Sequence, residues 1–274
     1  MTQESPTTPD WLRIRRGDAP VLLSLPHTGT LLPPEIADGR LVSRARALRD
    51  TDWYIEAVYD FAAALGIGSI RTLVSRTVID VNRDPSGASL YPGQATTGLC
   101  PTETFDGAPL YVVGRAPDAA EVAVRRARWF DPYHAALQAE LERLRSQHGR
   151  VVLYDCHSIR SHVPRLFEGE LPQFNIGTND GRAASAELTA RIEAIAAASG
   201  RSHVTNGRFK GGWITRHFGR PDAGIEAVQM ELACRGYMRE GADDEPAAYD
   251  PAYAAPLKLI LGEMFQSILA HVIR

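Results

Sequence analysis

The stretch VLLSLPHTG, residues 21–29, is a short apolar run that ends at a proline and is followed at once by a histidine. Residues 21–25 predict a buried β-strand, because a continuous apolar run of this length bounded by a turn signal suits a covered strand. His27 then stands at the carboxyl end of that strand, where open α/β sheets bind their ligands. The pattern raises the hypothesis of a site at one edge of a sheet.

A second strand of the same design follows later in the chain. VVLYDCHS, residues 151–158, is apolar at its start and has His157 near its carboxyl end. One such histidine is more often an ordinary packed or surface residue, but two at equivalent positions indicate a site. We expect His27 and His157 to meet at one rim of the sheet.

The remaining sequence alternates strands with helices. Further strands are expected at residues 69–74, 77–81 and 227–232, and helices at residues 48–65, 121–145, 182–198 and 251–272. This alternation predicts an α/β fold in which a mixed, largely parallel sheet is flanked by helices. Residues 84–117 are rich in Gly, Pro and Thr without a sustained period, which is typical of a functional loop. Because no repeat or linker divides the sequence, we expect a single domain over residues 1–274.

Composition narrows the class of protein. Of the 274 residues, 44% are hydrophobic and 23% are charged, the balance of an ordinary globular protein. The formal net charge of -3 gives no electrostatic support for a nucleic-acid partner. No apolar run approaches the length of a membrane span, and the polar start MTQESPTTPD is unlike a signal peptide. We therefore expect neither a nucleic-acid partner nor a membrane partner.

The cysteines argue against two kinds of chemistry. Cys100, Cys156 and Cys234 are odd in number and form no CxxC pair, so neither a disulfide framework nor a cysteine zinc site is expected. We interpret the chain as a reduced, cytoplasmic protein. Cys156 precedes His157 on a strand, so the two side chains should face opposite ways, and Cys156 is better interpreted as a core residue. No G-x-S-x-G motif offers a nucleophilic serine instead.

Metal chemistry fits the two histidines better. A catalytic zinc ion typically has three protein ligands of the His, Asp or Glu kind. The segment RDTDWYIEAVYDF offers Asp50, Asp52 and Glu56, although acids at a helix start also serve as caps. The company of two histidines favours Asp52. Asp155, on the same strand face as His157, could orient that imidazole by a hydrogen bond.

Two further stretches hold polar groups where apolar residues would be expected. In SRTVIDVNRDP, Asp80 and Asn82 share a face of the expected strand, and Arg83 follows at its end. An arginine fork suits a substrate carboxylate, although a surface salt bridge would explain the same residues. In AVQMELACRGYM, Glu231 interrupts an apolar strand and needs a partner, which water held at a metal would supply.

Taken in order, six blocks carry a family resemblance. SLPHTG, DTDWYIEAVYDF, RTVIDVNRDP, YDCHS, GRFKGGWITRHFG and AVQMELACRGYM together resemble the N-formylglutamate amidohydrolase (N-formylglutamate deformylase) family. The resemblance implies a zinc-exopeptidase-like (phosphorylase/hydrolase-like) α/β fold. It also implies hydrolysis of N-formyl-L-glutamate to formate and L-glutamate, the last step of one route of histidine degradation.

The resemblance assigns roles to the central residues. His27 and His157 match the two metal histidines, and Asp52 resembles the carboxylate ligand, with Asp50 as the alternative. Glu231 is similar to the glutamate that acts as general base. The metal motif departs from the HxxE of zinc carboxypeptidases, because Thr28, Gly29 and Thr30 follow His27 and the carboxylate must come from another segment.

The run Asp80, Asn82 and Arg83 resembles a run of zinc carboxypeptidases in which the aspartate braces a ligand histidine and the other two hold the substrate carboxylate. By this resemblance Arg83 binds the α-carboxylate, and Arg76 or Arg216 binds the side-chain carboxylate. Lys210 and His217 lie in similar blocks and could line the pocket; for these two, Arg76 and Arg216, a solvated face is an equally good interpretation.

Two other functions fit the same residues. One is a zinc hydrolase that acts on another N-acyl amino acid or on a peptide C-terminus. The other is a binding protein without catalysis, against which the retention of Glu231 argues, since a structural zinc site needs no free base.

Overall fold

The computed structural model describes residues 8–241 and 245–273, and the expectation about a signal peptide falls largely on residues 1–7, outside this range. Within these described residues, one sheet of seven strands has the order β1-β3-β2-β4-β7-β5-β6. The pairs β1/β3 and β5/β7 are antiparallel and the other pairs are parallel, which confirms a mixed, largely parallel sheet. The strands are β1 (Leu12–Arg15), β2 (Val21–Leu25), β3 (Gly68–Thr72), β4 (Val151–Ile159), β5 (Phe174–Gly177), β6 (His203–Thr205) and β7 (Ile225–Ala233).

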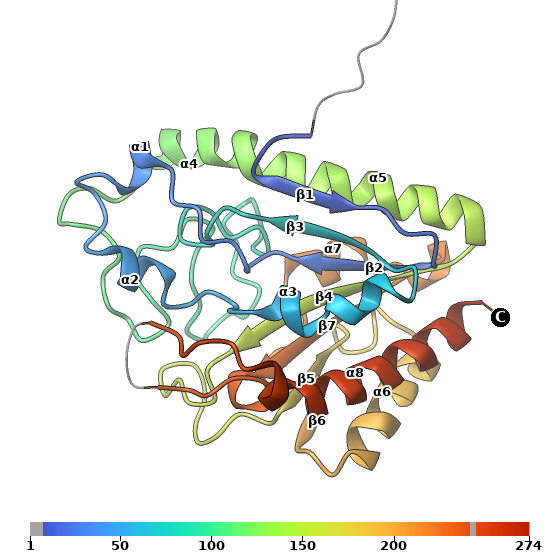
Figure 1. Cartoon of the computed structure of the whole chain (residues 1–274). Coiled ribbons are helices and arrows are strands. Elements are labelled where there is room, and N and C mark those ends of the chain that lie inside the picture. The colour runs from blue at the N-terminus through green and yellow to red at the C-terminus, as the bar shows by residue number, and fades with distance from the viewer. Residues whose placement is uncertain (1–7, 242–244, 274) are drawn as a thin grey trace, which may run out of the picture.

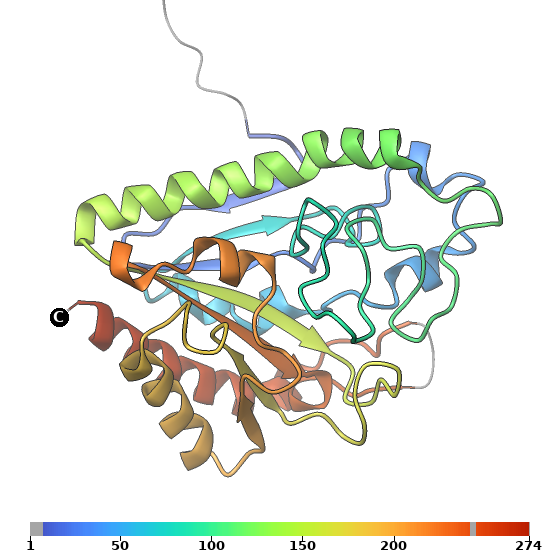
Figure 2. The same ribbon diagram turned by 180° about the vertical axis from the view of Figure 1, so that it is seen from behind.

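Helices cover both faces of this sheet (Figure 1). On one face α3, α6 and α8 enclose a core with β2, β4 and β7. On the other face, seen from behind in Figure 2, α5 and α7 enclose a second core. The helices are α1 (Pro34–Ala37), α2 (Arg44–Leu48), α3 (Ile55–Val58), α4 (Ala119–Arg125), α5 (Asp131–His148), α6 (Ala186–Ala198), α7 (Trp213–Phe218) and α8 (Pro251–Val272).

The central strand β4 shows how its sequence serves both layers. Val152, Tyr154 and Cys156 point into the core under α6 and α8, so Cys156 is the core residue that its position predicted. Val151 and Leu153 point toward α5. This alternation is the period of two that a strand imposes on its side chains. The residues that continue the α5 face are Asp155 and His157, which are buried but polar.

The prediction of a helix over residues 48–65 is wrong. Only α3 and a 3₁₀ turn, Asp60–Ala63, form there, and Tyr54 takes a left-handed backbone with φ 62°. The main-chain N–H of Asp52 donates to the carbonyl oxygen of His27 at 3.0 Å, which holds residues around Asp52 against the end of β2. This tertiary contact keeps the segment out of a regular helix.

The prediction of a strand over residues 77–81 is also wrong, because this segment is a series of turns. Ser75 Oγ accepts a hydrogen bond from Thr77 N at 3.2 Å, and Asp80 Oδ1 accepts one from Asn82 N at 2.9 Å. Short polar side chains that bind the backbone two residues ahead compete with the hydrogen bonds of a sheet. The β-branched residues therefore indicated burial here rather than a strand.

Other expectations were met more closely. The helix expected over residues 121–145 is present as α4 and α5, joined by one π-helical turn, Arg126–Phe130. The loop over residues 84–117 contains neither helix nor strand, only isolated bridges such as Glu103 to Pro109. The short strands β1, β5 and β6 were not predicted. All three cysteines are free, and within the described residues no helix is long and apolar enough to cross a membrane.

Candidate active site

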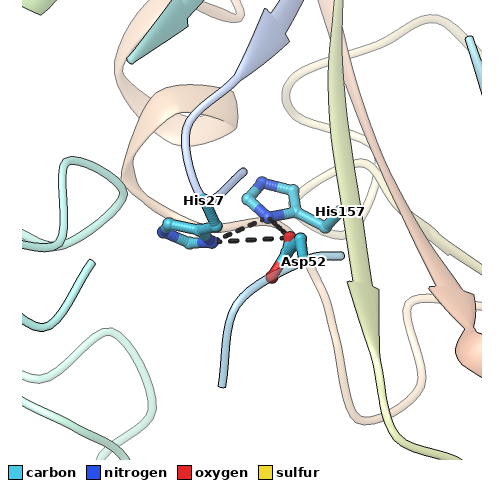
Figure 3. A group of neighbouring side chains, drawn as sticks. All are labelled: His27, Asp52 and His157. Atoms are coloured by element: carbon cyan, nitrogen blue, oxygen red, sulfur yellow. Dashed lines mark hydrogen bonds and ion pairs between the residues drawn. The ribbon is translucent and has the colours of Figure 1, made fainter. Parts of the chain in front are cut away.

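Two histidines meet at the carboxyl edge of the sheet. Strands β2 and β4 are parallel neighbours, with Ser24 paired to Asp155, so the residues that follow in each strand reach the same rim. His27 Nδ1 and His157 Nδ1 lie 3.1 Å apart, and both side chains are buried (Figure 3). The expectation that they share one rim is confirmed.

Asp52 completes a group of three. Its Oδ2 lies 3.3 Å from His157 Nδ1 and 3.7 Å from His27 Nδ1, so that the three donor atoms converge on one point (Figure 3). Asp50, the alternative acid, points elsewhere: its oxygens accept from Phe105 N at 2.7 Å and from Arg160 at 3.3 Å. The geometry therefore favours Asp52 over Asp50 as the third donor.

A carboxylate holds the far nitrogen of each imidazole. Asp80 Oδ1 lies 2.7 Å from His27 Nε2, and Asp155 Oδ2 lies 2.7 Å from His157 Nε2. An ionised carboxylate can only accept, so each Nε2 donates, and each Nδ1 of a neutral ring is left with a lone pair. Both lone pairs and the Asp52 oxygen face one another, an arrangement that attracts a cation.

The pKa shifts of His157 and Asp52 also indicate that the site favours positive charge. Burial by itself would lower the pKa of His157, but Asp155 and Asp52 outweigh it and hold that pKa well above its ordinary value. Burial would likewise raise the pKa of Asp52, but the adjacent imidazoles of His157 and His27 outweigh it and lower that pKa. Donor atoms bound tetrahedrally at zinc bond lengths would stand about 3.3 Å apart. The separations here fit such an ion without large movement.

The turns at residues 75–83 supply the braces. Asp80 accepts from Arg76 Nη2 at 2.7 Å, and Arg76 Nη1 lies 3.5 Å from Asp52. Arg76 is thus committed to two carboxylates, although its guanidinium also lines the pocket. Asn82 Nδ2 donates to Asp155 Oδ2 at 3.2 Å, and its Oδ1 accepts from Ile214 N at 2.8 Å. Asn82 therefore joins the histidine site to the start of α7.

A pocket opens beside the two histidines, with about 550 Å³ of empty space including solvent at its mouth. Glu231 lines it from β7, directly opposite His157 on β4. Gln229 lies two residues earlier on the same face; its Oε1 accepts from Gly212 N at 2.7 Å, so its Nε2 donates to Glu231 at 3.2 Å. Burial raises the pKa of Glu231 to about 8, against the lowering effect of His157.

The expected pocket arginines divide into two groups. Arg83 lines the pocket, and its Nε donates to Thr97 O at 3.0 Å. Arg216 does not line this pocket: its Nε donates to Gly211 O at 2.8 Å. Lys210 instead pairs with Asp180 at 3.1 Å, and His217 stacks on the Trp213 ring. The last three belong to the structure around α7 rather than to the pocket wall.

Sequence reasoning missed several pocket residues, among them the polar side chains Tyr91, Arg208 and Gln229. Gln229 could have been found, because it is a polar residue two positions before Glu231 in an otherwise apolar strand. Arg208 lies in the block GRFKGGWITRHFG, but nothing local separates it from Arg216. Tyr91 lies in the long loop, where no period indicates which side chains face inward.

A largely parallel α/β sheet with a buried His–His–Asp group and a buried glutamate at its carboxyl edge defines an α/β protein with a candidate metal-dependent active site. Comparison with known protein families also indicates a hydrolase. The profile of the family described as N-formylglutamate amidohydrolase matches residues 19–238, and the chain belongs to this family.

Individual relatives agree with this assignment. The N-formylglutamate deformylases of Pseudomonas aeruginosa and Pseudomonas putida are 49% and 46% identical to this chain over 260 residues, which covers 94% of this chain and 96% of each relative. The crystal structure of N-formylglutamate amidohydrolase from Ralstonia eutropha JMP134 is similar with a TM-score of 0.77 at 24% identity, over 95% of this chain and 98% of that one. The gene product Atu2144 from Agrobacterium tumefaciens has a TM-score of 0.69 at 19% identity, over 94% and 95% of the two chains. These two structures support the fold.

Proposed function

We propose that this protein hydrolyses N-formyl-L-glutamate to formate and L-glutamate with a bound divalent metal ion, and that the ion is zinc. The observation that carries the proposal is the convergence of His27 Nδ1, His157 Nδ1 and Asp52 Oδ2 beside a buried glutamate. The names of the two Pseudomonas relatives supply the substrate.

His27, His157 and Asp52 would hold the ion. Two imidazoles and one carboxylate are the donor set of many catalytic zinc sites, and such sites keep a further position open. When bound, the ion supplies a Lewis acid that polarises a carbonyl group and acidifies water. Asp80 and Asp155 keep both imidazoles in the tautomer whose Nδ1 lone pairs face the ion.

Glu231 would act as the general base and then as the general acid. It takes a proton from the attacking water and returns it to the glutamate nitrogen as the C–N bond of the formamide breaks. Both tasks need a pKa near the working pH, and burial moves the pKa of Glu231 to about 8. Gln229 donates to one carboxylate oxygen and leaves the other for the proton.

The test is formate release from N-formyl-L-glutamate by the purified protein, together with metal analysis of the same sample. About one zinc ion per chain and formate release that a chelator abolishes are expected. Release of acetate from N-acetyl-L-glutamate at an equal rate would contradict the proposal and favour a general N-acyl amino acid hydrolase. Formate release from metal-free protein would contradict the metal.

Three wider expectations stay predictions. We infer a single domain because one sheet takes strands from both halves of the chain. A cytoplasmic location rests on the reduced state inferred for the cysteines. A place in histidine degradation rests on the family resemblance.

A further inference from the structure

Arg208 is a pocket cation without a carboxylate partner among residues 8–241 and 245–273. Its Nε donates to Leu166 O at 2.7 Å and its Nη2 to Ala95 O at 2.8 Å. The rings of Tyr91 and Phe209 lie 5.3 Å and 5.4 Å from its guanidinium carbon. All of these neighbours are neutral, and burial lowers the pKa of Arg208. A partly desolvated cation in such surroundings gains strongly from an anion that enters the pocket.

The other two pocket arginines lie closer to the histidine site. Arg76 is bound to Asp80, the carboxylate that braces His27. Arg83 Nη1 lies 3.5 Å from the same carboxylate. Within the described residues, Arg208 makes no hydrogen bond or ion pair with His27, His157, Asp52, Asp80 or Asp155; its hydrogen bonds go to main-chain carbonyls instead. Arg83 is thus tied directly to a carboxylate that braces His27, whereas Arg208 is tied to main-chain carbonyl groups of two loops.

One short segment of the long loop fixes both Arg83 and Arg208. Thr97 O accepts from Arg83 Nε at 3.0 Å, and Ala95 O, two residues earlier, accepts from Arg208 Nη2 at 2.8 Å. The loop is itself anchored, because Tyr91 Oη donates to Gly211 O at 3.0 Å. Two guanidinium groups are thus held in place before any ligand binds, which lowers the entropy cost of binding.

Resting on the proposed function, we propose that Arg208 binds the side-chain carboxylate of the substrate while Arg83 binds its α-carboxylate. The side-chain carboxylate of a formylated glutamate stands two methylene groups farther from the formyl carbon than the α-carboxylate does. Arg83, which contacts the carboxylate that braces His27, suits the nearer α-carboxylate, and Arg208, which has no such contact, suits the farther one. In this proposal Arg208 has the role for which the sequence analysis considered Arg76 or Arg216, namely binding the side-chain carboxylate.

The experiment measures kcat/KM of the native protein, Arg208→Gln and Arg83→Gln on three substrates. These are N-formyl-L-glutamate, N-formyl-L-glutamine, which lacks the side-chain charge, and N-formyl-L-isoglutamine, which lacks the α-carboxylate charge. Arg208→Gln should lower kcat/KM about 10- to 100-fold for N-formyl-L-glutamate and N-formyl-L-isoglutamine but less than about 3-fold for N-formyl-L-glutamine, because the lost bond is a charge-assisted one. Arg83→Gln should show the reverse preference between the two amides.

The matched control is Arg191→Gln, an arginine on α6 that pairs with Glu187 away from the pocket, and it should leave all three rates unchanged. An equal loss on N-formyl-L-glutamate and N-formyl-L-glutamine in Arg208→Gln would overturn the inference while the proposed function stands. If Arg208→Gln does not fold, Arg208→Lys serves instead, with an expected loss of about 5-fold confined to the same two substrates.

A binding measurement separates this inference from the proposed function. If the native protein releases no formate from any substrate, the proposed function fails, and calorimetry with L-glutamate and L-glutamine still tests Arg208. The native protein should bind L-glutamate at least about 10-fold more tightly than L-glutamine, and Arg208→Gln should lose that difference. No difference in the native protein would contradict the role of Arg208.

Discussion

At the scale of single residues, the site depends on which nitrogen of each imidazole faces inward. Asp80 and Asp155 each hold a far nitrogen at 2.7 Å, so the inner nitrogens of His27 and His157 remain acceptors 3.1 Å apart. Two lone pairs and a carboxylate oxygen at such separations repel one another unless a positive charge lies among them.

The first prediction concerns the three donors. His27→Ala, His157→Ala and Asp52→Asn should each lose most of the bound metal and the activity, because each removes one donor of three. Asp50→Asn should keep the metal, since Asp50 binds Phe105 N and Arg160 instead. Metal analysis after dialysis gives the measurement. His203→Ala, at an exposed histidine on β6, is the control, and full occupancy in His27→Ala would refute the assignment.

The second prediction concerns Glu231. Glu231→Gln should keep the metal and the substrate KM but lower kcat by about 100-fold or more, because the amide cannot accept and return the proton. The amide fits, since its oxygen can accept from Gln229 as the carboxylate does. Steady-state formate release measures the effect, and Glu142→Gln, at an exposed site on α5, is the control. A kcat within a few-fold of the native value would leave Glu231 without a catalytic role.

At the scale of the elements, the site combines strand ends with turns. Strand β4 places Asp155 and His157 on one face by its period of two. The turns at residues 75–83 bring Asn82 against Asp155 and Asp80 against His27. The direction of the strand side chains follows from local, regular geometry. The positions of the turn residues depend on contacts between segments far apart in the chain. The strand ends and the turns must fit closely, and this leaves little room for added atoms.

The third prediction tests that fit at Gly212, the residue before α7. A Cβ on Gly212 would lie 2.4 Å from Asn82 Nδ2, and Asn82 cannot move freely because it binds Asp155 and Ile214 N. Gly212→Ala should lower the free energy of unfolding by about 1–3 kcal/mol, the usual cost of overpacking, and should lower kcat as well. Gly98→Ala, where no atom lies within 4 Å of the added Cβ, should change neither. Equal melting temperatures for the two variants would contradict the tight contact.

The fourth prediction concerns pH and helix α5, which supports the turns from behind. His134 Nε2 donates to Val81 O at 2.8 Å, its ring stacks between Phe130 and Phe218, and its Nδ1 is buried without a partner among the described residues. Burial, with a contribution from His217, lowers the pKa of His134 to about 4. The unfolded chain thus binds a proton below about pH 6.5 that the folded protein refuses until about pH 4.

Stability should therefore be complete above about pH 6.5 and should fall as the pH drops toward 4. His134→Phe removes this titration, so the native protein should lose up to about 1.4 kcal/mol per pH unit more than the variant within that window. Denaturant unfolding at several pH values measures both slopes, and effects of the metal ligands cancel in the difference. Parallel slopes would show that His134 is not held neutral.

At the scale of the whole molecule, the site joins segments that are widely separated in the sequence. His27 follows β2, Asp52 lies in the chain before α3, and His157 is part of β4. A ligand that binds all three therefore binds the folded chain and not the unfolded one, and such a ligand stabilises the fold by mass action.

The fifth prediction follows from this linkage. Removal of the metal by a chelator should lower the melting temperature by about 5–15 °C, as expected if several kcal/mol of binding free energy are lost in a protein of this size. Addition of zinc should restore it. His27→Ala should show no zinc-dependent shift, which controls for weak surface binding. Identical melting curves with and without chelator would contradict a structural link between the metal and the fold.

The features that depend on regular elements could be predicted from the amino-acid sequence. Apolar runs ending in His27 and His157 predicted parallel strands whose carboxyl ends meet, and the period of two predicted that Asp155 shares a face with His157. The position of Glu231 within an apolar strand indicated a buried carboxylate for the same reason. The two-residue period of a strand is a local property, so it can be deduced from the order of neighbouring residues.

Which side chains of the loops and turns reach the site could not be predicted from the sequence and is seen in the folded structure. It distinguishes Asp52 from Asp50 through the contact of Asp52 N with His27 O, and Arg208 from Arg216 through the carbonyl oxygens of Ala95 and Leu166. Residues 77–81, for which a strand was predicted, form turns in the structure. In irregular segments no repeat fixes the direction of a side chain, because distant parts of the chain supply the contacts that orient it.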